Sequence, residues 1–134
     1  VSAFLREILR LYPPAWMIVR ESTQNGEIDG QPYRMGDYFF IGVHQIHRHP
    51  DYWHDPLHLN LDNQIDKNIA FLPYGFGKRH CIGSRLADLE LKMILGILLE
   101  SYQLDYRGDE KPIRSKVMIT AYPDDPVRIQ FSTR

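Results

Sequence analysis

The sequence predicts an α+β fold, because two stretches carry apolar residues at helical spacing while other segments have the pattern of short strands. The two helical stretches are Ser2–Leu11 and residues 84–102. Asn-Gly, Asp-Gly and Pro-containing turns separate the strand-like runs, which is typical of small antiparallel sheets. With 134 residues, 43% of them apolar, the chain can form at most one domain, over residues 1–134.

The composition limits the classes of function. A net charge of −1, from 16 Lys+Arg against 17 Asp+Glu, gives no reason to expect a nucleic-acid partner. The single cysteine excludes an internal disulfide framework and fits a reducing compartment. No apolar run approaches the roughly 18 residues of a membrane span, and the start shows no signal peptide. We expect a cytoplasmic location, or the cytoplasmic side of a membrane if an upstream anchor exists.

The first helix is predicted over Ser2–Leu11. Its apolar face consists of Phe4, Leu5, Ile8, Leu9 and Leu11. Pro13-Pro14 should end it, because proline lacks the amide hydrogen that a helix interior needs. Since this helix starts almost at residue 1, the chain looks cut from a longer one. Glu7 and Arg10 stand three residues apart on one face, where such a pair is usually a solvated surface contact.

Short strands are predicted between and after the helices. Residues 15–20 form an extended apolar segment that ends in an arginine. Residues 21–43 have the pattern of short strands with tight turns, and Tyr38–Ile41 is the most strand-like piece. Residues 117–121 and 127–131, joined through two prolines and two aspartates, are predicted to pair as a terminal hairpin.

The second helix, over residues 84–102, is apolar around most of its circumference, so we expect it to be buried. Its narrow polar stripe consists of Arg85, Asp88 and Lys92. Cys81 precedes this helix, at a place where the helix dipole favours a thiolate. Glycines 75, 77 and 83 can adopt positive φ or let a flat, bulky ligand approach the backbone, and Arg79 suits a carboxylate. Taken alone, a lone cysteine is more often a small buried hydrophobic residue.

The stretch from Tyr74 to Gly83 resembles the cysteine-ligand loop of the cytochrome P-450 haem-thiolate monooxygenases, usually written FxxGxRxCxG. Gly77, Arg79, Cys81 and Gly83 match at their spacings, while Tyr74 stands where Phe is usual. The resemblance implies haem b (iron protoporphyrin IX) with the Cys81 thiolate as axial iron ligand. The cofactor-binding residues that it implies are Arg20, Tyr74, Gly75, Phe76, Gly77, Arg79, Cys81, Ile82, Gly83 and Ala87.

A second motif supports the same family. The sequence Glu-Ile-Leu-Arg of residues 7–10, followed by Leu-Tyr-Pro-Pro, is similar to the family's ExxR helix, whose ion pair is buried behind the haem. By the same resemblance, Ala15, Trp16 and Met17 line the substrate pocket and Arg20 faces a haem propionate. A buried strand with an exposed arginine at its end would have a similar sequence.

Residues 44–56 resemble the family's H-R-x-P…W-x-D-P segment. Five histidines, at positions 44, 47, 49, 54 and 58, also invite a zinc hypothesis, but they lack a cysteine or carboxylate frame with tight ligand spacing. We therefore expect surface or hydrogen-bonded histidines. Asn63 stands where the family usually has an arginine that joins the Glu–Arg pair, which puts that three-membered network in doubt.

The resemblance covers essentially the whole chain but only the C-terminal part of the family's mainly helical catalytic domain with its small sheets. The intact parent would be a monooxygenase that inserts one atom of O₂ into an apolar small molecule. Its electrons would come ultimately from NAD(P)H through a ferredoxin, a flavodoxin or a flavoprotein reductase, which the cationic residues Lys78, Arg85 and Lys92 could attract. The alternative is a haem-holding or inert remnant without oxygen activation, because the family's oxygen-activating helix lies upstream. We expect these 134 residues alone to be molten, aggregating or dependent on a partner, without turnover.

Overall fold

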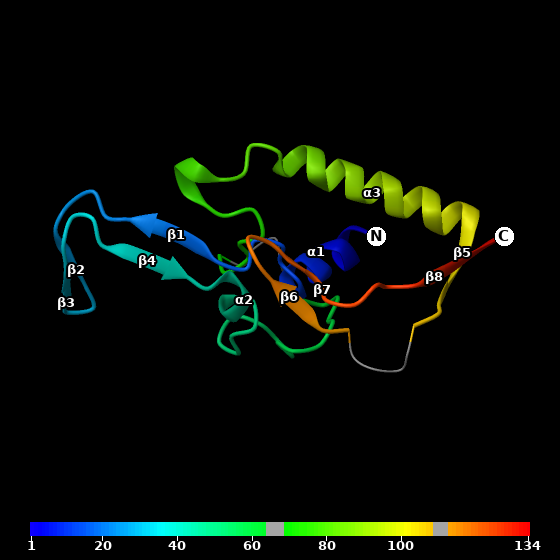
Figure 1. Cartoon of the computed structure of the whole chain (residues 1–134), viewed down its shortest axis with the longest axis horizontal. Helices are drawn as coiled ribbons and strands as arrows, with labels where there is room; N and C mark the ends of the chain where they lie inside the picture. Colours follow the sequence, from blue (N-terminus) through cyan, green and yellow to red (C-terminus); the bar gives the residue numbers. More distant parts are fainter. Residues whose placement is uncertain (64–68, 109–112) are drawn as a thin grey trace.

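The computed structural model describes residues 1–63, 69–108 and 113–134 (Figure 1). In chain order, its elements are α1 (Ser2–Leu11), β1 (Ile18–Glu21), β2 (Gly26–Ile28), β3 (Gln31–Tyr33), β4 (Tyr38–Ile41), α2 (Val43–Ile46), η2 (Gly77–Arg79), α3 (Ser84–Ser101), β5 (Tyr102–Tyr106), β6 (Ser115–Val117), β7 (Ala121–Pro123) and β8 (Ile129–Thr133). The strands form antiparallel two-stranded sheets. The predicted α+β class is confirmed.

Helix α1 has the predicted bounds. It ends where the Tyr12 N–H donates to the Ile8 carbonyl at 2.7 Å and the backbone turns to φ −130°, just before the two prolines. Leu11 faces the interior, together with Glu7 and Arg10. The helix therefore buries a charged pair along with its apolar stripe, and this pair organises the surrounding loops.

Strands β1 to β4 follow the predicted pattern of turns. β1 pairs with β4, and β2 pairs with β3 across the Asp29-Gly30 turn, where φ is +48° and +76°. Gly36, at φ +91°, makes the turn before β4. The β2–β3 hairpin lies at the far end of the molecule from β5 and β8, and the β1–β4 pair leads back toward α1 (Figure 1). This arrangement places residues 12–17 between α1 and β1.

The predicted terminal hairpin is wrong. β6 pairs with β7 around a tight turn in which the Met118 N–H donates to the Thr120 carbonyl, and β8 pairs instead with β5. β5 begins at Tyr102, so the second helix stops one residue earlier than predicted. The alternating residues of β5 allow five cross-strand pairs with β8, and Tyr102 packs edge-on against Phe131 at 5.8 Å. Those pairings favour an extended chain over another helical residue.

Helix α3 is less buried than its sequence predicts. None of its side chains is fully buried, and large apolar residues such as Leu89 and Ile94 remain more than half exposed. Figure 1 shows α3 along one side of the molecule, and α1 is in contact with it. Among the residues that the structure describes, no helix is long and apolar enough to cross a membrane.

Among the residues that the structure describes, the buried part of the molecule is small and partly polar. Its apolar members include Leu11, Pro13, Val43, Trp53, Ala70 and Pro73, and its polar members are Glu7, Arg10 and His47. Ile46 and Phe71 pack against the pair of Trp53 and Ala70. The interior thus joins α1, α2 and the segment that runs toward Cys81.

Candidate functional site

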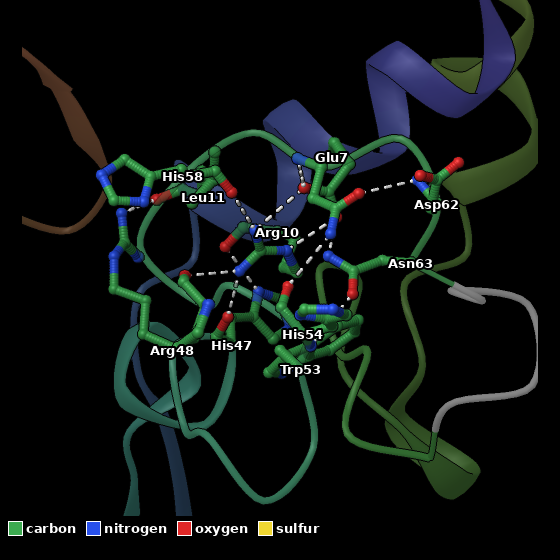
Figure 2. A network of polar contacts seen from close by, with 12 residues as sticks. Glu7, Arg10, Leu11, His47, Arg48, Trp53, His54, His58, Asp62 and Asn63 are labelled. Atoms are coloured by element: carbon green, nitrogen blue, oxygen red, sulfur yellow. Dashed lines mark hydrogen bonds and ion pairs between the residues drawn. The ribbon is translucent and has the colours of Figure 1, made fainter.

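The Glu7–Arg10 pair is completely buried. Both residues have 0% exposure, and Arg10 Nε and Nη2 donate to the two Glu7 carboxylate oxygens at 2.7 and 2.9 Å (Figure 2). A bidentate pair of this geometry is among the strongest hydrogen-bonded contacts in proteins. The solvated surface contact that an i,i+3 pair usually makes is excluded here.

Arg10 also donates hydrogen bonds to three loop carbonyls. Its Nη1 donates to the carbonyls of His47 and Pro56, each at 2.8 Å, and its Nη2 donates to that of His58 at 2.9 Å. Its guanidinium lies 5.3 Å from the centre of the Trp53 ring. One buried cation therefore fixes residues 47–58 against α1.

Asn63 completes the network, contrary to the doubt raised by the sequence. Its Nδ2 donates to Glu7 Oε1 at 3.1 Å, and its Oδ1 accepts from the His54 N–H at 3.2 Å (Figure 2). The Asn60 N–H donates to Glu7 Oε2 at 3.0 Å. Burial alone would raise the pKa of Glu7, but the hydrogen bonds from Arg10, Asn60 and Asn63 outweigh it and lower that pKa. An amide can replace an arginine because the carboxylate needs a donor, and Arg10 already balances its charge.

Replacing Asn63 by alanine in the haem-loaded protein should lower the free energy of unfolding by about 1.5 kcal/mol, because one oxygen of the Glu7 carboxylate loses a donor. Chemical denaturation followed by circular dichroism measures this change. Asn60→Ala is the control, because Asn60 reaches Glu7 through its backbone N–H while its side chain bonds to the exposed backbone of His54 and Asp62. Equal losses in the two variants would show that the Asn63 side chain has no special role.

The cysteine loop begins with two turns that need glycine. The Gly75 N–H donates to the Leu72 carbonyl at 3.1 Å, and φ is +75° at Gly75 and +65° at Gly77. Other residues would be strained at such angles. The Cys81 N–H then donates to the Tyr74 carbonyl at 2.9 Å, which closes the loop.

Gly83 differs from the other two glycines. Its φ is −86°, so positive φ is not the reason for glycine here. A β-carbon at this position would lie 4.0 Å from Cys81 Sγ, an ordinary contact distance. Gly83 is the N-cap of α3, and its carbonyl accepts the Ala87 N–H at 2.9 Å.

Cys81 is a free, exposed cysteine, which contradicts the alternative of a small buried hydrophobic residue. Apolar side chains near it in sequence are also exposed, including Phe76 at 43% and Ile82 at 102%. The Arg20 guanidinium lies 5.5 Å from the centre of the Phe76 ring, so β1 and the cysteine loop are in contact. Arg79 is exposed in η2, two residues before the thiol.

The three predicted pocket residues have different surroundings. The Trp16 indole N–H donates to the Met118 carbonyl at 3.0 Å, and Trp16 lines a cavity of about 910 Å³. The rest of the described lining comes from the end of α1, from α2 and from residues 113–123, without the cysteine loop. Ala15 is exposed and Met17 is half-buried. Their role as pocket wall stays a prediction.

Sequence reasoning missed a contact between the cysteine loop and α3. The Tyr74 hydroxyl donates to Asp88 Oδ1 at 2.8 Å, which the phenylalanine usual at this position cannot do. Burial and the Asp88 carboxylate raise the pKa of Tyr74 to about 12. The departure from the motif and the polar stripe of the helix were both visible in the sequence, but their pairing was not.

The histidines do not form a common metal site in the described part of the chain. Within residues 1–63, 69–108 and 113–134, no three His, Cys, Asp or Glu side chains are placed to hold a metal ion together. His58 Nδ1 lies 2.7 Å from Asp55 Oδ1, and burial together with the charge of Arg48 lowers the pKa of His44. His47 is fully buried.

Comparison with known proteins gives the family. The cytochrome P-450 family profile matches residues 1–131. The chain belongs to the cytochrome P-450 family. Over 137 residues it is 34% identical to thromboxane-A synthase of Macaca fascicularis, covering 97% of this chain and 26% of that protein. Over 121 residues it is 31% identical to cytochrome P-450 93B2 of Gerbera hybrida, covering 81% of this chain and 24% of that protein.

Solved P-450 structures share the fold. The crystal structure of the cytochrome P-450DA heme domain superposes with a TM-score of 0.88 at 26% identity, covering 99% of this chain and 31% of that chain. The chain thus spans about a quarter of the length of the curated relatives that it matches. The P-450 family uses haem, and the residues present here fit that group. The exposed thiol of Cys81 follows Gly75 and Gly77, which both have positive φ. Exposed apolar side chains and Arg79 are its neighbours in the sequence, and Arg20 lies over the ring of Phe76 in the same loop.

Proposed function

We propose that this P-450 chain binds haem b through the thiolate of Cys81 and that the protein containing it is a monooxygenase acting on apolar small molecules. The observation that carries the proposal is the exposed Cys81 thiol on a loop shaped by Gly75 and Gly77. When bound, haem with a thiolate ligand supplies an iron centre that favours cleavage of the O–O bond. The chain's own contribution is to hold the sulfur at a fixed place.

Several residues would hold the cofactor's edges. Arg20 and Arg79 would pair with the propionates, since guanidinium groups suit carboxylates. Phe76, Ile82 and Ala87 would offer apolar contact to the macrocycle. The position of Arg20 over Phe76 supports this assignment, because it places a cation beside an exposed apolar surface of the cysteine loop.

Electrons would come from NAD(P)H through an acidic ferredoxin, flavodoxin or flavoprotein reductase. Lys78 and Arg85 are exposed, and Lys92 follows Arg85 by seven residues and so lies on the same side of α3. Asp88, which stands between them, is hydrogen-bonded to Tyr74. These cations would attract an acidic partner to this side of α3. The proposed location is the cytoplasm, or the cytoplasmic side of a membrane if an upstream anchor exists.

Haem-loaded protein should show the far-red ferrous–CO band of thiolate ligation, and Cys81→His should move that band to the position of imidazole-ligated haem. The measurement is the difference spectrum of the dithionite-reduced protein with and without CO. His80→Gln is the matched control, because it removes the neighbouring imidazole and leaves the thiol. An unchanged spectrum in the Cys81 variant, or a changed ligand type in the His80 variant, would show that the ligand is another residue.

A further inference from the structure

The imidazole of His47 connects α1 to the segment that enters the cysteine loop. Its Nε2 lies 2.8 Å from the Leu72 N–H, and its Nδ1 lies 3.0 Å from the Arg10 carbonyl. An amide N–H can only donate and a carbonyl oxygen can only accept. The two partners therefore fix the ring as the neutral tautomer with its proton on Nδ1.

Aromatic contacts also hold the His47 ring in place. It stacks on Phe71 with the ring centres 5.6 Å apart and meets Trp53 edge-on at 6.1 Å. Its own backbone carbonyl accepts from Arg10 Nη1, so His47 and Arg10 are joined in both directions (Figure 2). A side chain with 0% exposure and these partners has no freedom to turn away from the Leu72 amide.

The connection continues from Leu72 to the cysteine. The Leu72 carbonyl accepts the Gly75 N–H, and the carbonyl of Tyr74 accepts the Cys81 N–H. These two backbone hydrogen bonds, joined by the peptide bond between Tyr74 and Gly75, connect the imidazole contact to the turn that presents the thiol. Hydrogen bonds and the short stretches of backbone between them thus connect the buried ion pair of α1 to the residue that carries the exposed sulfur.

We propose that His47 is a positioning residue for Cys81, which transmits the fixed position of the Glu7–Arg10 pair to the cysteine loop through its contact with the Leu72 N–H. The resemblance to the P-450 family accounts for a histidine in this segment, and the geometry assigns its task. The proposal rests on the proposed function, because it concerns the placement of the iron ligand.

Neutral imidazole is the form that the site requires. Burial lowers the pKa of His47 to about 4 against the opposing hydrogen bond to the Arg10 carbonyl, and the positive charges of Arg10 and Arg48 act in the same direction as burial. At neutral pH Nε2 is therefore free of a proton and can accept from Leu72.

Two substitutions of His47 test its two ring nitrogens separately. Asparagine carries its amide on Cγ, so His47→Asn keeps a donor toward the Arg10 carbonyl and loses the acceptor for Leu72. Glutamine carries its amide one atom farther out, so His47→Gln keeps an acceptor for Leu72 and loses the donor to Arg10. The measurements, on the haem-loaded protein, are hydrogen exchange at the Leu72 amide by NMR in the ferrous–CO form and the share of thiolate-type absorbance in the ferrous–CO spectrum.

His47→Asn should raise the exchange rate of the Leu72 amide by about tenfold or more and convert part of the thiolate-type band to the non-thiolate type. His47→Gln should retain both the protection and the band, because the backbone carbonyl of residue 47 still accepts from Arg10 Nη1 and keeps this residue tied to the ion pair. Parent-like Leu72 protection in the Asn variant, or a full thiolate band despite lost protection, would overturn the positioning role. A parent without a thiolate band would instead refute the proposed function, and the two failures are thus distinguishable.

Discussion

Replacing Arg10 by alanine should lower the free energy of unfolding of the haem-loaded protein by about 3–5 kcal/mol, the usual cost of leaving a buried charge without its partner. The Glu7 carboxylate would keep only its donors from Asn60 and Asn63, and the carbonyls of His47 and Pro56 would lose theirs. Chemical denaturation followed by circular dichroism and haem absorbance measures the change.

The double variant Glu7→Leu with Arg10→Met tests whether Arg10 stabilises the fold through Glu7 alone or also through the loop carbonyls. Replacing both members of a buried pair by apolar residues often costs little. Here the double variant should remain destabilised, because Arg10 also satisfies three loop carbonyls that no apolar side chain can serve. Arg85→Ala, on the exposed face of α3, is the control and should change stability by less than about 0.5 kcal/mol. A loss below about 1 kcal/mol in Arg10→Ala would contradict the buried network.

The chain of residues 1–134, purified without haem, should show little hydrogen-exchange protection in α3 and should not turn over substrate. Its surface is 10656 Å², whereas a compact monomer of 15.8 kDa exposes about 7300 Å². Leaving even several hundred Å² of apolar surface in water forfeits about 5–10 kcal/mol, comparable with the net stability of a whole domain. The exposed apolar side chains of α3, such as Leu86, Leu89 and Ile97, contribute to that surface.

The measurement is hydrogen exchange by mass spectrometry on material whose mass in solution is checked by sedimentation. α1 is the internal reference, because the Glu7–Arg10 network ties it to residues 47–63. Exchange should be faster in α3 than in α1. Strong protection across both helices in a monomer would mean that the exposed face of α3 needs no partner for stability.

Local patterns in the sequence determined much of the candidate site. The bounds of α1, its Glu7–Arg10 pair and the turns before β4 depend on spacing and on glycine and proline chemistry, which act within a few residues. The same holds for the cysteine loop, where Gly75 and Gly77 adopt the positive φ that their residue type permits. Such features need no knowledge of distant contacts, and the structure confirms them.

The tertiary structure alone decided which distant groups meet. β8 pairs with β5 and not with residues 117–121, and the amide of Asn63 serves Glu7 where an arginine was expected. Likewise Tyr74 reaches Asp88 and His47 reaches Leu72. Each of these contacts satisfies a donor or acceptor across a sequence separation of 14 to 56 residues or pairs two strands. Residue type shows that a polar group needs a partner, but only the folded arrangement of the backbone determines which partner lies within hydrogen-bond distance.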